Sequence, residues 1–241
     1  MNSIIPLSIA PMGMINCFLI KGSTHYILVD TGVPNSEANI LKQLKELRIA
    51  KEKINLMILT HAHIDHFGSA ARLKEILNVP VLAHRLDEPY FRTGQPDTTT
   101  MKPTKPIWNL LRKNLINKKT LPVSIDIVME ADQVYSLYPW GVDGVVIHTP
   151  GHTKGSLSII LENGEAIIMD MMASGILLGG IMLRSRVKHP PFHDDFNALR
   201  HSFTKVLSFP GDRYYLGHGG PVNRRKVKEY YQKLSKLSTH A

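Results

Sequence analysis

Cysteine is nearly absent from this sequence, since Cys17 is the only one among 241 residues. A single cysteine excludes an internal disulfide framework and a metal site built only from thiolates. Cys17 lies in the apolar run 14–20, which indicates a small buried side chain. This cysteine usage fits a reducing compartment.

Long hydrophobic runs are also missing. No stretch approaches the roughly 18 uninterrupted apolar residues of a membrane-spanning helix. Residues 1–20 are apolar, but they contain no Lys or Arg and are interrupted by Pro6, Pro11 and Gly13, unlike an export signal. We therefore expect a cytoplasmic protein without a membrane partner.

The overall composition, 43% apolar and 20% charged, is that of an ordinary globular protein. The formal net charge of +9 is concentrated in residues 102–119 and 224–236. Such an excess is usually a solvated basic surface, but it also attracts anionic small molecules or nucleic acid. Charge alone does not separate these alternatives.

Hydrophobic periodicity predicts alternating strands and helices. Strands are predicted at 4–9, 14–20, 25–30, 54–59, 79–83, 125–129, 133–137, 144–148, 156–161, 165–169 and 214–216. Helices are predicted at 35–48, 69–77, 194–208 and 223–236. Two rounds of strands followed by helices predict two similar halves that pack sheet against sheet.

Residues 84–122 differ from the rest of the chain, because they hold five prolines and a polar tract at 97–100. The segment is predicted to be irregular, with one helix near 107–117. A long irregular loop inside a compact domain often serves as a lid over a site.

The most informative stretch is residues 60–66, which read Thr-His-Ala-His-Ile-Asp-His. Three imidazoles and a carboxylate follow directly after the apolar strand 54–59. Imidazole nitrogens and carboxylate oxygens are ligands for zinc and similar divalent metals. The pattern therefore predicts a metal site, unless the rest of the chain leaves it as a His-rich loop.

Four further ligand-type residues also lie at or just past predicted strand ends. These are Asp30, His152, Asp170 and His218. Strand ends at one edge of a sheet converge in space, which is where sites are commonly built.

This set of residues resembles the metallo-β-lactamase-fold hydrolases, whose pattern is H-x-H-x-D-H followed by a distant His, Asp and His. The matching positions are His61, His63, Asp65, His66, His152, Asp170 and His218. The resemblance extends over essentially the whole chain. It implies a single domain over residues 1–241, an α/β (α+β) fold built as a four-layer αββα sandwich of two mixed sheets flanked by helices.

The resemblance also implies two divalent metal ions at one edge of the sandwich. His61, His63 and His152 would hold the first, Asp65, His66 and His218 the second, and Asp170 would bridge them. Zinc is the expected metal, although iron, manganese and cobalt accept the same ligands. Two metals about 3.5–4 Å apart lower the pKa of a bound water and stabilise a developing oxyanion, and Asp65 is the expected catalytic residue.

The expected reaction is hydrolysis of a small-molecule ester, thioester or lactone by a hydroxide held between the two metals. The true β-lactamases of the family lack the bridging carboxylate that Asp170 supplies, so β-lactam hydrolysis is not expected. The acyl-homoserine lactonases place a tyrosine where this chain has Ala173. Two alternatives stay open, namely an RNA or phosphodiester hydrolase and a mono-iron persulfide-type dioxygenase.

Several neighbouring residues have two interpretations. Asp30 is either a turn residue or a carboxylate that accepts the free N–H of a ligand histidine. Lys154 is a candidate for binding a substrate carboxylate, or a solvated lysine. His189 and His193 flank 190–192 and are candidates for reaching the site, while His84 is expected to be an ordinary histidine.

Overall fold

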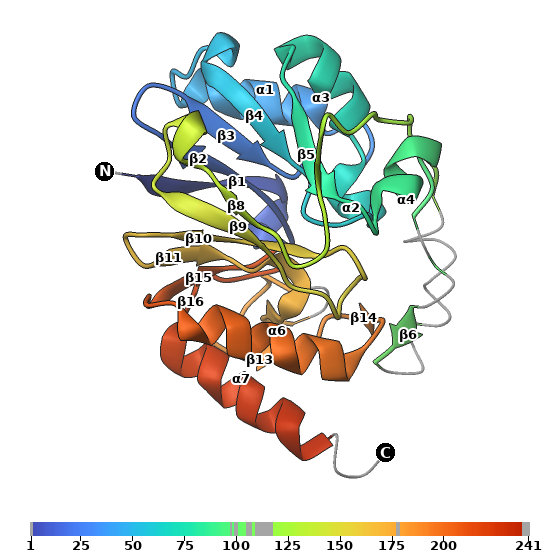
Figure 1. The fold of residues 1–241 in the computed structure, drawn as a ribbon, viewed down its shortest axis with the longest axis vertical. Coiled ribbons are helices and arrows are strands. Elements are labelled where there is room, and N and C mark those ends of the chain that lie inside the picture. The colour runs from blue at the N-terminus through green and yellow to red at the C-terminus, as the bar shows by residue number, and fades with distance from the viewer. Residues whose placement is uncertain are drawn as a thin grey trace.

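The computed structural model describes residues 2–96, 98, 101–104, 108, 118–176 and 179–237. The helix predicted near 107–117 falls largely outside these residues. Figure 1 shows two β-sheets stacked face to face, with helices on both outer sides. Among the described residues, no helix is both long and apolar enough to cross a membrane.

The first sheet comes from the N-terminal half and has six strands. Their order is β1 (Ser3–Ala10), β2 (Ile15–Lys21), β3 (Tyr26–Val29), β4 (Ile54–Ile58), β5 (Val81–His84) and β7 (Ile127–Met129). The pairs β1–β2 and β2–β3 are antiparallel, whereas β3, β4, β5 and β7 run parallel. The parallel part brings several strand C-termini to one edge.

The second sheet comes from the C-terminal half and also has six strands. Their order is β16 (Val222–Asn223), β15 (Arg213–Tyr215), β11 (Glu165–Ile167), β10 (Leu157–Leu161), β9 (Gly144–His148) and β8 (Val134–Ser136). Only β11 and β15 pair in parallel, and the other neighbours are antiparallel.

Helices cover the outer face of each sheet, as Figure 1 shows. The first sheet carries α1 (Glu37–Glu46) and α3 (Ala70–Leu77), and the second carries α6 (Phe196–Ser208) and α7 (Arg224–Leu237). Asp195 caps α6 by accepting hydrogen bonds from the N–H groups of Asn197 and Ala198. The fold is therefore the four-layer αββα sandwich that the resemblance implied.

Strand alternation explains why three apolar layers form. Successive side chains of a strand point to opposite faces, so Ile159 of β10 packs between the sheets and Ile160 packs toward α6 and α7. On the other side, Leu28 of β3 belongs to one apolar cluster with Leu44 of α1 and Leu73 of α3. Both faces of each sheet are buried, which fixes the strands and hence the positions of their ends.

Short elements that the sequence did not predict lie around the edge of the sandwich. They are α2 (Ile64–Phe67), α4 (Glu88–Thr93), β6 (Lys102–Pro103), β12 (Ala173–Ser174), β13 (Val187–Lys188) and β14 (Phe192–His193), with 3-10 turns η1 (Pro11–Gly13), η2 (Lys51–Lys53), η3 (Tyr138–Trp140) and η4 (Met169–Met171). The predicted strand 165–169 is shorter in the structure. It ends at Ile167, and Met169 has a positive φ of 39°, which starts η4.

Candidate metal centre

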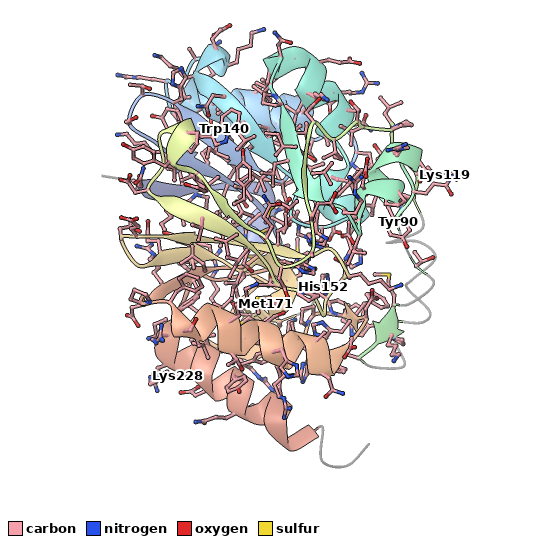
Figure 2. All side chains as sticks on the ribbon, in the orientation of Figure 1. Tyr90, Lys119, Trp140, His152, Met171 and Lys228 are labelled. Atoms are coloured by element: carbon pink, nitrogen blue, oxygen red, sulfur yellow. The ribbon has the colours of Figure 1, made fainter. Side chains whose placement is uncertain are left out.

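The candidate ligands follow four strands at one edge of the sandwich. The stretch 60–66 follows β4, His152 follows β9, Asp170 lies in η4 after β11, and His218 follows β15. Figure 2 shows His152 between the upper and lower halves of the molecule. The two sheets thus contribute ligands to one place.

The local backbone of residues 60–66 explains how four ligands come from so short a segment. His63 has extended backbone angles and precedes the helix α2, which begins at Ile64. Asp65 and His66 therefore lie on a helical turn, whereas His61 and His63 precede it. The two pairs belong to different groups of candidate ligands.

The first group contains His61, His63 and His152, whose candidate ligand nitrogens all lie within 4.8 Å of one another. Nε2 of His152 is 3.0 Å from Nδ1 of His63. The rings of His61 and His152 meet edge to face with centroids 4.8 Å apart. All three side chains are buried.

The second group contains Asp65, His66 and His218, whose candidate ligand atoms also lie within 4.8 Å of one another. Nε2 of His218 is 3.3 Å from Oδ2 of Asp65. His66 and His218 are buried, and the side chain of Asp65 is 29% exposed.

Asp170 lies between the two groups. Its Oδ2 is 3.1 Å from Nε2 of His218 and 3.5 Å from Nε2 of His152. Its Oδ1 is 3.7 Å from Nε2 of His66. One carboxylate thus faces histidines of both groups, as expected of a residue that bridges two cations.

The outward Nδ1 atoms of His66, His152 and His218 have protein partners. His66 donates to Oδ2 of Asp30 across 2.8 Å, and His152 donates to the carbonyl of Phe192 across 3.0 Å. His218 donates to the carbonyl of Met14. These contacts fix the tautomers and leave each Nε2 lone pair directed inward.

His61 is oriented by a relay through Thr60. The Thr60 hydroxyl donates to Oδ2 of Asp30 across 2.7 Å, so it accepts from Nδ1 of His61 at 3.0 Å. The N–H of Thr60 also donates to Oδ1 of Asp30. Asp30 therefore supports one histidine of each group, and its φ of 59° also makes it a turn residue. Both interpretations of Asp30 describe the structure.

Several inward atoms are buried without a hydrogen-bond partner among the described residues. They are Nε2 of His61 and His66, and Oδ1 of Asp170. An unpaired buried polar atom costs about 1–3 kcal/mol, and here three of them converge. Divalent cations satisfy nitrogen and carboxylate lone pairs in this arrangement, so the residues fit the implied metals.

The two groups differ electrostatically. Burial lowers the pKa of His63 to about 4 and holds the pKa values of His61 and His152 well below their usual range. Burial opposes protonation of His66 and His218 too, but Asp170 and Asp65 outweigh it. The pKa of His66 rises to about 9, and that of His218 rises well above its usual range. The first group is a set of neutral donors, whereas the second is rich in negative charge.

A cavity of about 100 Å³ opens beside these residues. It is lined by Ile15, Val33, His63, Asp65, Met101, His152, Asp170, Pro191, Phe192 and His218, and we call it the ligand cavity. A larger hollow of about 610 Å³ lies near Trp140 and contains no candidate ligand. Figure 2 shows Trp140 well away from His152.

The remaining candidates take different places. Lys154 is exposed and lies outside the ligand cavity. His189 is half-buried, and its Nδ1 is 2.7 Å from the hydroxyl of Tyr230. His193 is fully buried, with its ring edge-on to His152 at 5.4 Å, and neither ring nitrogen has a partner among the described residues. His84 stacks on His148 at 3.8 Å, away from the ligand cavity.

Asp87 is a supporting residue that the sequence did not reveal. Its buried carboxylate accepts hydrogen bonds from the N–H of Ala62, the N–H of Gly155 and the hydroxyl of Thr153, at 2.8–2.9 Å. It thereby joins the loop of His61 and His63 to the loop of His152. Asp87 precedes α4, so its sequence signal was that of a helix N-cap, although its side chain does not cap.

Known proteins with similar sequences include metal-dependent hydrolases. The sequence pattern of the metallo-beta-lactamase superfamily matches residues 10–218. A probable metallo-hydrolase of Bacillus subtilis, YflN, is 24% identical over 87% of this chain and 81% of its own length. An N-acyl homoserine lactonase from a Bacillus species is 26% identical over 62% of this chain and 59% of its own length.

The same fold is found among solved structures. The crystal structure of the metallo-beta-lactamase MIM-1 from Novosphingobium pentaromativorans aligns with a TM-score of 0.65. The alignment covers 93% of this chain and 82% of MIM-1 at 18% identity. At that identity, the likeness concerns the fold alone.

Proposed function

Since this chain belongs to the metallo-beta-lactamase superfamily, we propose that it cleaves an ester, thioester or lactone bond of a small molecule with the help of two divalent cations. In this proposal His61, His63 and His152 hold one cation, and Asp65, His66 and His218 hold the other. Asp170 lies against both. Zinc is the proposed metal, because its preference for imidazole and carboxylate ligands matches this set.

The observation that carries the proposal is the convergence of unpaired buried atoms among the candidate ligands beside the ligand cavity. Nε2 of His61 and His66 and Oδ1 of Asp170 have no hydrogen-bond partner among the described residues. On the outward side, Nδ1 of His66 and Nδ1 of His152 donate hydrogen bonds that fix the orientation of these two rings. Such an arrangement is costly in a purely structural cluster and useful in a metal site.

The bound cations would lower the pKa of a water molecule and stabilise negative charge on a carbonyl oxygen. Hydrolysis then requires that the water oxygen bond to the carbonyl carbon and that the C–O or C–S bond break. The leaving oxygen or sulfur takes a proton. No serine or cysteine nucleophile is needed, and Cys17 is fully buried.

Asp65 is proposed as the catalytic residue of the chain. Its carboxylate lines the ligand cavity and is more exposed than that of Asp170, at 29% against 4%. Burial alone would raise the pKa of Asp65, but His66 and His218 hold it well below its usual range. Asp65 therefore stays ionised, accepts hydrogen bonds and cannot act as a proton donor at neutral pH.

The choice of a carbonyl substrate has support from one relative and from the walls of the site. The lactonase from the Bacillus species is a distant relative that acts on an acylated lactone by name. At the position expected for an assisting tyrosine, this chain has Ala173. Among the described residues that line the ligand cavity there is no tyrosine, so the proposal is not restricted to lactones.

The test is a parallel substrate screen on protein of measured metal content, covering thioesters, esters, lactones, phosphodiesters and β-lactams. We expect turnover of carbonyl substrates and its loss in Asp65→Ala, with the circular dichroism spectrum unchanged. Asp143→Ala, an exposed aspartate near Asn2, is the matched control.

Two outcomes would replace the proposal. Turnover of RNA or phosphodiesters alone, with salt-sensitive binding, would favour the phosphodiesterase that the net charge of +9 allows. A single iron and no zinc in active protein would favour a dioxygenase. Full activity in Asp65→Ala would contradict the assigned role of Asp65.

A further inference from the structure

The ligand cavity has two chemically different walls. One wall consists of candidate metal ligands, and the other of five apolar residues, Ile15, Val33, Met101, Pro191 and Phe192. Apolar side chains next to a polar reaction centre exclude water and bind hydrocarbon, but they offer nothing to a charged group.

A second, larger hollow lies on the other side of Met101. Its volume is about 550 Å³, and its apolar lining comes from Leu86, Met101, Pro150 and Ala198. We call it the Leu86 groove. Met101 lines both hollows, and only 4% of its surface is exposed. The side chain of Met101 therefore lies between the two hollows.

The loop 150–155 also separates the two hollows. His152 faces the ligand cavity, while Pro150, Thr153 and Lys154 of the same loop line the Leu86 groove. A small hollow between them is lined by His63, Thr153 and Lys154, among other residues. The Leu86 groove therefore adjoins the ligand cavity, with Met101 and the loop 150–155 lying between the two hollows.

A two-stranded sheet fixes the chain next to Met101 and Phe192. Strand β6 pairs with β14, where Pro103 is opposite Phe192 and Lys102 is opposite His193. The N–H of Thr104 donates to the carbonyl of Pro191 across 2.8 Å. Met101 and Phe192 belong to one apolar cluster, so the apolar wall has a defined position.

The charges around the Leu86 groove balance. Lys102 and Lys154 are offset by Asp194 and Asp195. The carboxylate of Asp195 already accepts two N–H groups of α6. Four charges of balanced sign give no net attraction for an anion, so Lys154 is not supported as a carboxylate receptor.

We infer that the substrate carries an unbranched alkyl chain, which runs from the reacting carbonyl in the ligand cavity past Met101 into the Leu86 groove. This inference rests on the proposed function for the position of the carbonyl. The chain belongs to either the acyl part or the alcohol or thiol part, because the groove recognises only its hydrocarbon.

Two substrate series show whether the alkyl chain belongs to the acyl part or to the alcohol or thiol part. In the first, the acyl group grows from acetyl through butyryl and hexanoyl to octanoyl on one constant thiol. In the second, acetyl is constant and the thiol grows from ethyl to octyl. We expect kcat/KM to rise about fourfold for each CH2 buried in the series whose chain occupies the groove. A flat response in both series contradicts the inference.

Variants locate the effect. Ala198→Phe places a ring in the Leu86 groove and is expected to lower the ratio of octanoyl to acetyl kcat/KM about sixteenfold, equivalent to losing roughly two buried CH2 groups. Leu86→Ala should lower the same ratio by a smaller factor. Leu121→Ala is the matched control, since Leu121 is 50% exposed and Leu86 is 48% exposed. If all three variants keep the wild-type ratio of octanoyl to acetyl kcat/KM, the alkyl chain does not lie in the Leu86 groove.

A binding readout separates this inference from the proposed function. Calorimetric titration with butyrate, hexanoate and octanoate should show a Kd that falls about fourfold per CH2, together with a negative heat-capacity change. If no ester or thioester is hydrolysed but the gradient persists and Ala198→Phe abolishes it, the proposed function fails and the groove assignment stands. If carbonyl substrates are hydrolysed without any dependence on chain length in rate or Kd, only the groove assignment fails.

Discussion

Nδ1 of His66 donates a hydrogen bond to Oδ2 of Asp30 across 2.8 Å, with both side chains fully buried. The contact joins the end of β3 to the helix α2 and turns Nε2 of His66 toward Asp170. Asp30 also receives two hydrogen bonds from Thr60, so the orientation of the candidate centre depends on one carboxylate.

Replacing Asp30 tests this dependence. Asp30→Asn removes the negative charge and puts an amide where two donors now point, so His66 loses its fixed tautomer. We expect the affinity for both cations to fall, by about 10–100-fold for the cation at the group of Asp65, His66 and His218. Competition with a metal chelator measures this, and Glu52→Gln, an exposed residue of η2, is the control. Unchanged affinity for both cations would show that the contact is only structural.

Asp87 is expected to control the spacing between the two ligand loops. Asp87→Asn keeps the size of the side chain, but one oxygen acceptor becomes a donor facing the N–H of Ala62 or Gly155. We predict a loss of about 1–3 kcal/mol in the free energy of unfolding and weaker binding at the group of His61, His63 and His152. Urea unfolding and metal titration measure the two effects, with Asp143→Asn as control. A loss of stability without any change in metal binding would restrict Asp87 to a structural role.

Gly217 leaves room for the candidate centre. A Cβ at this position would lie 2.2 Å from Oδ1 of Asp170 and 2.8 Å from Cε1 of His66. In Gly217→Ala both side chains must shift, so we expect loss of bound metal and at least about a hundredfold loss of activity, since misplacement by about 1 Å costs that much.

Gly164→Ala is the matched control for general destabilisation. Gly164 has a φ of 87° in the turn between β10 and β11, so alanine is strained there but far from the ligands. Gly164→Ala should have a lower melting temperature than the wild type but a normal metal content. If Gly217→Ala retains its metal and its activity, the close packing around Asp170 is not required.

The stacked pair His84 and His148 predicts a pH dependence of stability. Their planes differ by 12°, and burial lowers the pKa of both from 6.5. Because the unfolded chain then binds more protons than the folded one, the stability that the pair contributes is complete above pH 6.5 and declines as the pH falls below it. The slope is at most about 1.4 kcal/mol per pH unit for each histidine.

Urea unfolding of metal-free protein over about pH 5–8 measures this slope. His148→Gln should make it shallower than in the wild type. His201→Gln should leave it unchanged, because His201 is exposed and only contacts the carbonyl of Asn197 in its own helix. If the free energy of unfolding has the same pH slope in the wild type and both variants, His84 and His148 are not the source of the pH dependence.

Much of the fold was predictable because burial imposes a periodicity on the sequence. The strands and the four long helices predicted from that periodicity occur within a few residues of their expected limits. Short elements such as α2, α4 and β14 were missed, because segments of two to six residues are stabilised by their surroundings and leave little periodicity. The end of β11 was misplaced, since the left-handed turn at Met169 has no sequence signal of its own.

The sequence by itself determined the chemistry of the candidate ligands and their order, because residue types and strand ends are local properties. The tertiary structure alone decided that Asp30 supports His61 and His66, that Asp87 joins the loop of Ala62 to the loop of Thr153, and that Asp194 and Asp195 offset Lys154. It also placed Leu86, Met101 and Ala198 around one groove. These relationships arise from the packing of two sheets against each other, and no spacing along the chain encodes them.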